Sequence, residues 1–193
     1  MKILKPFFSF IYQWGGKKIA REILPFIKRR GKVLDLGCGS GFLGKEVEIL
    51  SNSKVLGLDV DNFLLTDLEF LIFDGKRIPF PDNTFDVVLI VFVLHHTSDP
   101  IYLLREARRV GKKIIVLEDL IEGKISYFRC KLHLFFWELF YGQKLRKFNF
   151  FSEKEWETIF HKCGLSIVYK REIKIGSLDP VRKKFFVLER LKS

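Results

Sequence analysis

A run of closely spaced glycines constrains the fold of this chain more than any other feature. The segment from Val33 to Gly44 reads VLDLGCGSGFLG, so four glycines fall within eight positions directly after a short apolar run. Glycine adopts positive φ without steric cost, and its missing Cβ lets another molecule approach the backbone. A tight turn alone needs only one or two glycines. The run therefore predicts a strand, a ligand-binding turn and a helix, in that order.

Strand-like and helix-like segments alternate along the 193 residues. This alternation is typical of an α/β fold with a parallel sheet and helices on both faces. The predicted strands cover residues 32–36, 54–59, 70–73, 86–92, 112–117, 165–171 and 183–190, with antiparallel pairing at the end. The predicted helices cover residues 17–29, 42–50, 99–109, 124–140 and 152–163.

The connections between these elements carry further signals. Asp99 precedes Pro100, a typical helix start, and residues 152–155 (SEKE) form a capping-box pattern. Between Asp59 and Asp74 there is room for only a short helix. No linker or repeat divides the chain, which predicts a single domain.

Composition narrows the class of protein. Hydrophobic residues make up 48% and charged residues 30% of the chain, which is typical of a globular protein. The three cysteines are scattered, without metal-ligand spacing, and indicate free thiols in a reducing, cytoplasmic compartment and no metal site. The first 14 residues (MKILKPFFSFIYQW) are interrupted by Pro6 and precede no small-residue cleavage site, so we interpret them as an amphipathic segment rather than a signal peptide.

The charge is unevenly distributed. Residues 1–32 carry a net charge of +8, residues 33–100 carry −7 and residues 101–193 carry +10. Basic ends favour anionic partners, either RNA or a membrane surface. Solvated faces of an ordinary Lys- and Glu-rich protein would show the same pattern.

Two cofactor motifs fit the glycine run. Residues 39–44 match the G-x-G-x-x-G pattern of dinucleotide binding, and Asp59 follows Gly39 by 20 residues. That frame leaves Gly37 and Asp35 without a role.

The other frame is D-x-G-x-G-x-G, formed by Asp35, Gly37, Gly39 and Gly41. It resembles motif I of class I S-adenosylmethionine-dependent methyltransferases. The resemblance continues in order through VLGLD (55–59), FDGKRIPFPDNTFD (73–86), VLHHTSDP (93–100) and CGLSIV (163–168). Together these segments are similar to the methyltransferase type 11 group, which includes ubiquinone and menaquinone biosynthesis methyltransferases.

This resemblance implies a Rossmann-like methyltransferase fold: a seven-stranded, mostly parallel sheet with an antiparallel last strand and helices on both faces. It implies one methyltransferase domain over residues 1–193. Within it, residues 1–30 would contain an N-terminal cap helix, and residues 120–151 a lid-like insertion after the fifth strand. Both would cover the acceptor pocket, although the apolar stripe in residues 121–151 is equally explained by core packing.

The resemblance also assigns cofactor contacts. Asp59 would hold the ribose hydroxyls. Leu58, Val60 and Ile78 are candidates for packing against the adenine, although each could equally be ordinary core. Asp74 would accept a hydrogen bond from the adenine amino group, and the Gly75 backbone would lie against the ring edge. The residues around the methionine portion would be Asp35, Gly37, Cys38, Gly39 and Gly41.

Methyl transfer is an in-line displacement, so alignment and exclusion of water are the main tasks. A base is needed only if the acceptor loses a proton. His95 and His96 follow the fourth strand at the rim where the acceptor would arrive, so either could be that base. The pair is also frequent in this family as a structural turn. The segment 91–96 (VFVLHH) replaces the Asn/Asp-Pro-Pro-Tyr/Phe motif of base-amino methyltransferases, which disfavours nucleic-acid acceptors.

The sequence therefore predicts S-adenosylmethionine-dependent methyl transfer to a small-molecule or lipid-like acceptor, with S-adenosylhomocysteine as product. The protein would be cytoplasmic, with peripheral membrane or RNA contact through its basic ends as an option. The alternatives are a non-catalytic methyltransferase-fold protein that binds RNA or another protein, an RNA methyltransferase, and an NAD(P)-dependent oxidoreductase.

Overall fold

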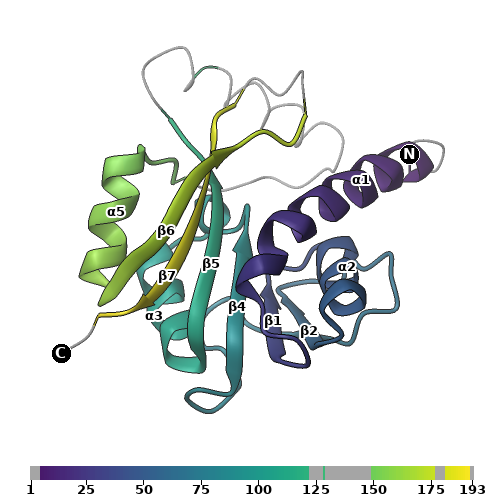
Figure 1. Ribbon diagram of the computed structural model, residues 1–193, viewed down its shortest axis with the longest axis horizontal. Coiled ribbons are helices and arrows are strands. Elements are labelled where there is room, and N and C mark those ends of the chain that lie inside the picture. The colour runs from purple at the N-terminus through teal and green to yellow at the C-terminus, as the bar shows by residue number, and fades with distance from the viewer. Residues whose placement is uncertain (1–4, 122–127, 129–148, 177–180, 192–193) are drawn as a thin grey trace.

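Seven strands form one sheet in the order β3-β2-β1-β4-β5-β7-β6 (Figure 1). The computed structural model describes residues 5–121, 128, 149–176 and 181–191. The strands are β1 (Lys32–Leu36), β2 (Lys54–Asp59), β3 (Phe70–Ile72), β4 (Phe85–Val91), β5 (Gly111–Asp119), β6 (Leu165–Ile173) and β7 (Lys183–Arg190). Strands β1 to β5 pair in parallel, whereas β7 is antiparallel to both β5 and β6. The predicted sheet, with its antiparallel last strand, is confirmed.

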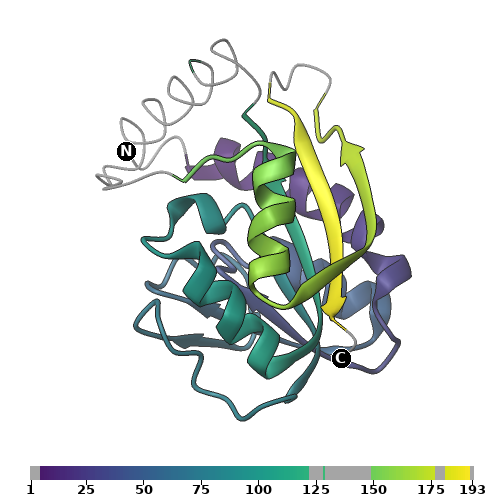
Figure 2. The same cartoon turned by 90° about the vertical axis from the view of Figure 1, so that its left-hand side faces the viewer.

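Helices cover both faces of this sheet. Helices α1 (Lys5–Ile23) and α2 (Phe42–Ser51) lie on one face, and α3 (Pro100–Val110) and α5 (Glu153–Lys162) lie on the other (Figures 1 and 2). Two short 3-10 helices, η1 (Leu24–Phe26) and η2 (Leu94–His96), follow α1 and β4. No helix in the described part of the chain is long and apolar enough to span a membrane.

Two hydrophobic clusters fill the spaces between the sheet and its helices. The first packs Leu104 of α3 and Trp156 and Phe160 of α5 against the central strands. The second packs Ile23 of α1 and Val47 of α2 against the opposite face. Because both faces are covered, β1 and β4 are nearly continuous runs of buried residues, as parallel strands usually are.

The N-terminal helix differs from the prediction. It begins at Lys5 rather than at residue 17, because Pro6 lies in its first turn, where a proline needs no N–H partner. Its glycines do not break it, since a Cβ on Gly16 would lie 3.1 Å from the backbone nitrogen of Leu43 in α2. The α-helix ends at Ile23 rather than at residue 29. Residues 24–26, which include Pro25, continue as a 3-10 turn, because a proline disfavours the α conformation in the residue before it.

Two further predictions concern the connection after β2 and the segment after β5. The connection between β2 and β3 contains no helix, although the sequence left room for a short one. The predicted helix at 124–140, and most of the predicted lid-like insertion at 120–151, lie outside the described residues. The remaining predicted elements are present with boundaries shifted by at most two residues.

The capping box at the start of α5 is formed as predicted. Ser152 Oγ accepts a hydrogen bond from the backbone of Glu155, whose carboxylate accepts one from the Ser152 backbone at 2.8 Å. We expect Ser152→Ala to lower the free energy of unfolding by about 1 kcal/mol, measured by urea denaturation. Thr158→Ala on the exposed face of the same helix is the matched control, and an equal loss in both variants would contradict this role of the cap.

Candidate cofactor-binding site

The glycine run forms a tight turn between β1 and α2. Gly37, Gly39 and Gly41 all have positive φ angles, of 74°, 51° and 79°. A Cβ on Gly37 would overlap with the side chain of Val93. A Cβ on Gly39, in contrast, would meet nothing within 4 Å among the described atoms. The turn is therefore closely packed beneath Gly37 and open at Gly39, where a ligand can lie against the backbone.

Hydrogen bonds fasten this turn to the carboxyl end of β2. The backbone N–H of Gly37 donates to the carbonyl of Leu58 at 2.7 Å, and that of Gly39 donates to Asp59 Oδ2 at 2.8 Å. Asp59 Oδ1 accepts from the backbone of Val60 at 2.7 Å. A carboxylate has about four lone-pair positions, so Asp59 keeps capacity for two further donors. This is the binding capacity that a ribose diol requires.

Asp35 lies beneath the turn and is only 2% exposed. Its Oδ2 has no hydrogen-bond partner among the described residues. Burial and repulsion by Asp59 raise the pKa of Asp35 to about 7, although the backbone amide of Gly44 partly offsets the shift. A buried carboxylate with one unpartnered oxygen disfavours its charged form until a cation arrives. The site therefore fits S-adenosylmethionine, which carries a sulfonium and an ammonium group.

Cys38 contributes its backbone to the turn, while its side chain belongs to the core. The thiol is buried and packs against Gly57, where a Cβ would lie 2.8 Å from Cys38 Sγ. Burial raises the pKa of the Cys38 thiol, and the charges of Asp35 and Asp59 raise it further. The thiol is therefore inert, and only the backbone of Cys38 is available to a ligand.

The segments after β2 and β3 meet beside Asp59. The backbone of Phe73 donates to the carbonyl of Asp59 at 3.0 Å, and a Cβ on Gly75 would lie 3.0 Å from Val60 Cγ1. Asp74 Oδ1 accepts from the backbone of Lys76 at 2.8 Å, which fixes the loop. The structure thus brings together four of the predicted site residues, Asp59, Val60, Asp74 and Gly75.

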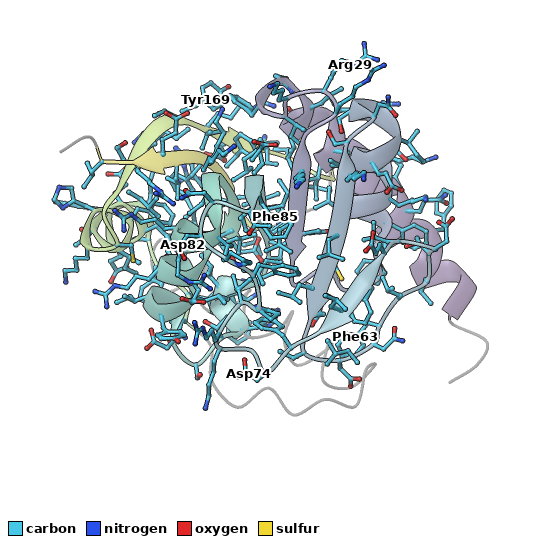
Figure 3. The ribbon with its side chains drawn as sticks, turned by 90° about the horizontal axis from the view of Figure 1, so that it is seen from below. Arg29, Phe63, Asp74, Asp82, Phe85 and Tyr169 are labelled. Carbon is cyan, nitrogen blue, oxygen red and sulfur yellow. The ribbon has the colours of Figure 1, made fainter. Side chains whose placement is uncertain are left out.

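An exposed apolar surface adjoins this segment. Val60 is 58% and Phe63 39% exposed, whereas Leu58 and Ile78, two further adenine candidates, are fully buried in the core. Figure 3 shows Phe63 and Asp74 on the same side of the molecule. Val60 and Phe63 can therefore contact an adenine ring, but Leu58 and Ile78 cannot. Phe63 was missed at the sequence level because a lone aromatic residue in a loop gives no signal of its own.

The two histidines have different environments. His95 is 5% exposed, and its Nδ1 lies 2.5 Å from Oε2 of the fully buried Glu118, near the end of β5. His96 is exposed. From the sequence alone, His95 and His96 are equal candidates and Glu118 has no assigned role, although an acid near the end of an otherwise apolar strand was an available signal. No group of three or more potential metal ligands occurs in the described ranges.

Comparisons with known proteins show similarity to methyltransferases. Residues 34–114 match the family model described as a methyltransferase domain. The chain is 28% identical over 206 residues to demethylmenaquinone methyltransferase of Bacillus cereus, covering 90% of this chain and 86% of that protein. It is 30% identical over 123 residues to tRNA U34 carboxymethyltransferase of Nautilia profundicola, which covers 56% of this chain. The chain spans only 41% of the length of that relative.

Solved structures share the fold. A Haloferax volcanii methyltransferase in complex with the Trm112 methyltransferase activator superposes with a TM-score of 0.75 at 19% identity, over 93% of this chain and 91% of that one. An S-adenosylmethionine-dependent methyltransferase from Methanosarcina mazei gives a TM-score of 0.68 at 17% identity, over 89% of this chain and 97% of that one. The relatives named here favour the D-x-G-x-G-x-G frame over the dinucleotide frame. Over the matched segment and in these two sequence relatives, the chain is similar to methyltransferases.

Proposed function

We propose that this protein transfers the methyl group of S-adenosylmethionine to a small-molecule or lipid-like acceptor, leaving S-adenosylhomocysteine. The observation that carries the cofactor assignment is the open glycine turn held by Asp59 next to the buried carboxylate of Asp35, whose Oδ2 has no hydrogen-bond partner among the described residues. When bound, the cofactor supplies an activated methyl group. The protein's tasks are then to bind, to orient and to exclude water.

Each part of the site has a proposed task. Asp59 accepts hydrogen bonds from the two ribose hydroxyls, and Val60 and Phe63 contact the adenine. Asp74 accepts from the adenine amino group, beside the Gly75 backbone. Asp35 balances the positive charge of the methionine portion. The backbone of residues 37–41 lies against that portion, because its glycines carry no Cβ and adopt positive φ angles.

Two features support a small-molecule or lipid-like acceptor. The similarity to demethylmenaquinone methyltransferase extends over 90% of the chain, well beyond the cofactor-binding half. Phe10 and Trp14 are 67% and 47% exposed on α1 and lie four residues apart, hence on one helix face. Such an aromatic face suits an apolar acceptor or a lipid surface. We assign α1 as the cap of the acceptor pocket.

An RNA acceptor is the second candidate. It is favoured by the net charge of +11 and by the similarity to tRNA U34 carboxymethyltransferase. A protein partner of the kind seen in the Trm112 complex would fit the same alternative. Under either proposal the enzyme acts in the cytoplasm. Its basic ends then contact an anionic partner, either a membrane surface or RNA.

Thermal unfolding with separate ligands tests the cofactor. S-adenosylhomocysteine at about 100 times its dissociation constant should add about 2.7 kcal/mol of stability, whereas NAD and NADP should add nothing. For a domain of this size the melting temperature should rise by roughly 5–10 °C. A shift with NAD or NADP alone, or no binding of S-adenosylhomocysteine by calorimetry, would overturn the assignment. Release of S-adenosylhomocysteine with reduced quinones, lipids and RNA then distinguishes the acceptors.

A further inference from the structure

Buried ionisable side chains gather at the carboxyl ends of β4 and β5 and at the amino end of β7. Glu118 is fully buried, His95 is 5% exposed and Lys183 is 7% exposed. Lys183 Nζ lies 3.1 Å from Oδ1 of Asp119. Charged groups are rarely buried unless they are paired or have a function. The Lys183–Asp119 pair joins two adjacent strands, but the Glu118–His95 pair joins β5 to a loop at the edge where the substrate arrives.

Glu118 fixes the loop after β4 through both of its carboxylate oxygens. Its Oε1 accepts hydrogen bonds from the backbone N–H groups of Val93, at 3.0 Å, and Leu94, at 2.7 Å. Its Oε2 faces Nδ1 of His95 at 2.5 Å. Two amide donors on one oxygen favour the ionised carboxylate, which can only accept. Nδ1 of His95 is therefore the donor, and the free lone pair of the neutral ring is on Nε2.

The ring of His95 is held in place from several sides. It stacks on Phe150, with ring centroids 5.1 Å apart and planes inclined by 15°, and lies 4.0 Å from the ring of His96. The backbone of Asn149 donates to the carbonyl of His95 at 3.0 Å. Within the described part of the chain, Nε2 has no hydrogen-bond partner. Since the two ring nitrogens point in different directions, Nε2 faces away from Glu118.

This histidine is close to the cofactor turn. Val93, two residues before His95, fills the space that a Cβ on Gly37 would occupy. The loop that Glu118 fixes is thus packed against the part of the turn assigned to the methionine portion. Under the proposed function, this packing places the loop beside the methionine portion of the cofactor.

We infer that His95 accepts the proton of the methyl acceptor through Nε2, that Glu118 is the residue that positions it, and that the acceptor carries a hydroxyl group. This inference rests on the proposed function. The hydroxyl oxygen forms the new bond to the methyl carbon while the carbon–sulfur bond breaks and its electron pair stays on sulfur. The hydroxyl proton moves to Nε2, and the imidazolium is stabilised by Glu118 until it returns the proton to solvent.

The surrounding charges are consistent with this role. Burial disfavours the imidazolium, but the charge and hydrogen bond of Glu118 outweigh it, so the pKa of His95 lies above its ordinary value. Asp119 raises this pKa further and Lys183 lowers it. A raised pKa means that the ring holds a transferred proton more strongly than a free imidazole does. A carboxylate or tertiary amine acceptor would need no base.

The test is the protonation of His95 in the 15N-labelled protein, followed by two-bond 1H–15N NMR. In the wild type the neutral ring should carry its proton on Nδ1. In Glu118→Gln the backbone donors of Val93 and Leu94 hold the amide oxygen, so the amide NH₂ faces Nδ1. The proton should then move to Nε2, and the pKa of His95 should fall by about one to three units.

Asp119→Asn is the matched control on the same strand. It removes the charge of Asp119, which is near His95 but is not hydrogen-bonded to it, so the proton should stay on Nδ1. The inference is overturned if the neutral wild-type ring carries its proton on Nε2. It is also overturned if the tautomer and pKa of His95 are unchanged in a folded Glu118→Gln variant. The wild-type spectrum decides the matter even if the variant fails to fold. Calorimetry with S-adenosylhomocysteine separates the two proposals. If the wild type does not bind it, the proposed function is contradicted. If the wild type binds it but His95 has the unexpected tautomer, only the role of His95 and Glu118 is contradicted.

Discussion

Asp35→Asn should make the ligand-free protein more stable than the wild type at about pH 8. The pKa of Asp35 is raised from 3.8 to about 7, mainly because the carboxyl is buried. One pKa unit corresponds to about 1.4 kcal/mol, so ionising this group in the folded state costs up to roughly 4 kcal/mol. The asparagine has a similar shape and no charge, and avoids this cost.

The pH dependence has a definite sign. Because the folded-state pKa is raised, the contribution of Asp35 to stability is fully present below its unfolded pKa and is lost as pH rises towards about 7. The difference between the variant and the wild type should therefore grow between about pH 4 and pH 7 and then level off. Urea denaturation of both proteins across this range measures it.

The same substitution should impair binding. S-adenosylmethionine loses the carboxylate that balances its positive charge, so its affinity should fall by about tenfold or more, as measured by calorimetry. Asp61→Asn, at an exposed position after β2, is the control and should change neither quantity. An Asp35→Asn variant less stable than the wild type at about pH 8 would show that Asp35 is already paired in the free protein.

Asp59→Ala should weaken cofactor binding by about 1.5–3 kcal/mol, or roughly 10- to 150-fold, because hydrogen bonds to a charged acceptor are stronger than neutral ones. Part of this loss has a second origin. Asp59 also accepts from the backbone of Gly39, so its removal loosens the glycine turn. Calorimetry with S-adenosylhomocysteine measures the sum of both effects.

Two further variants separate these contributions. Asp59→Asn keeps one acceptor oxygen for the turn but removes the charge, so it should lose less affinity than Asp59→Ala. Asp61→Ala, two residues further along the loop, should bind as the wild type does. If Asp59→Ala binds with unchanged affinity, the ribose is held elsewhere.

Much of the fold was predictable because its signals are local. Parallel strands covered on both faces read as apolar runs, which placed β1, β2 and β4 almost correctly. The glycines at 37, 39 and 41 need positive φ angles whatever lies around them, so they defined the turn. The start of α1 was wrong because the proline and glycines near it break an isolated helix, yet packing of Gly16 against α2 compensates.

The sequence by itself determined the order of the elements, the cofactor turn and the acids at its rim, since these follow from residue types at fixed spacing. The tertiary structure alone decided which histidine is held and by what. His95 and Glu118 are 23 residues apart, and only the pairing of β4 with β5 brings them to 2.5 Å. It also decided that Cys38 Sγ lies in the core and that Asp35 Oδ2 is left without a partner among the described residues. Burial and pairing depend on what surrounds a side chain, and those surroundings come from segments far apart in the chain.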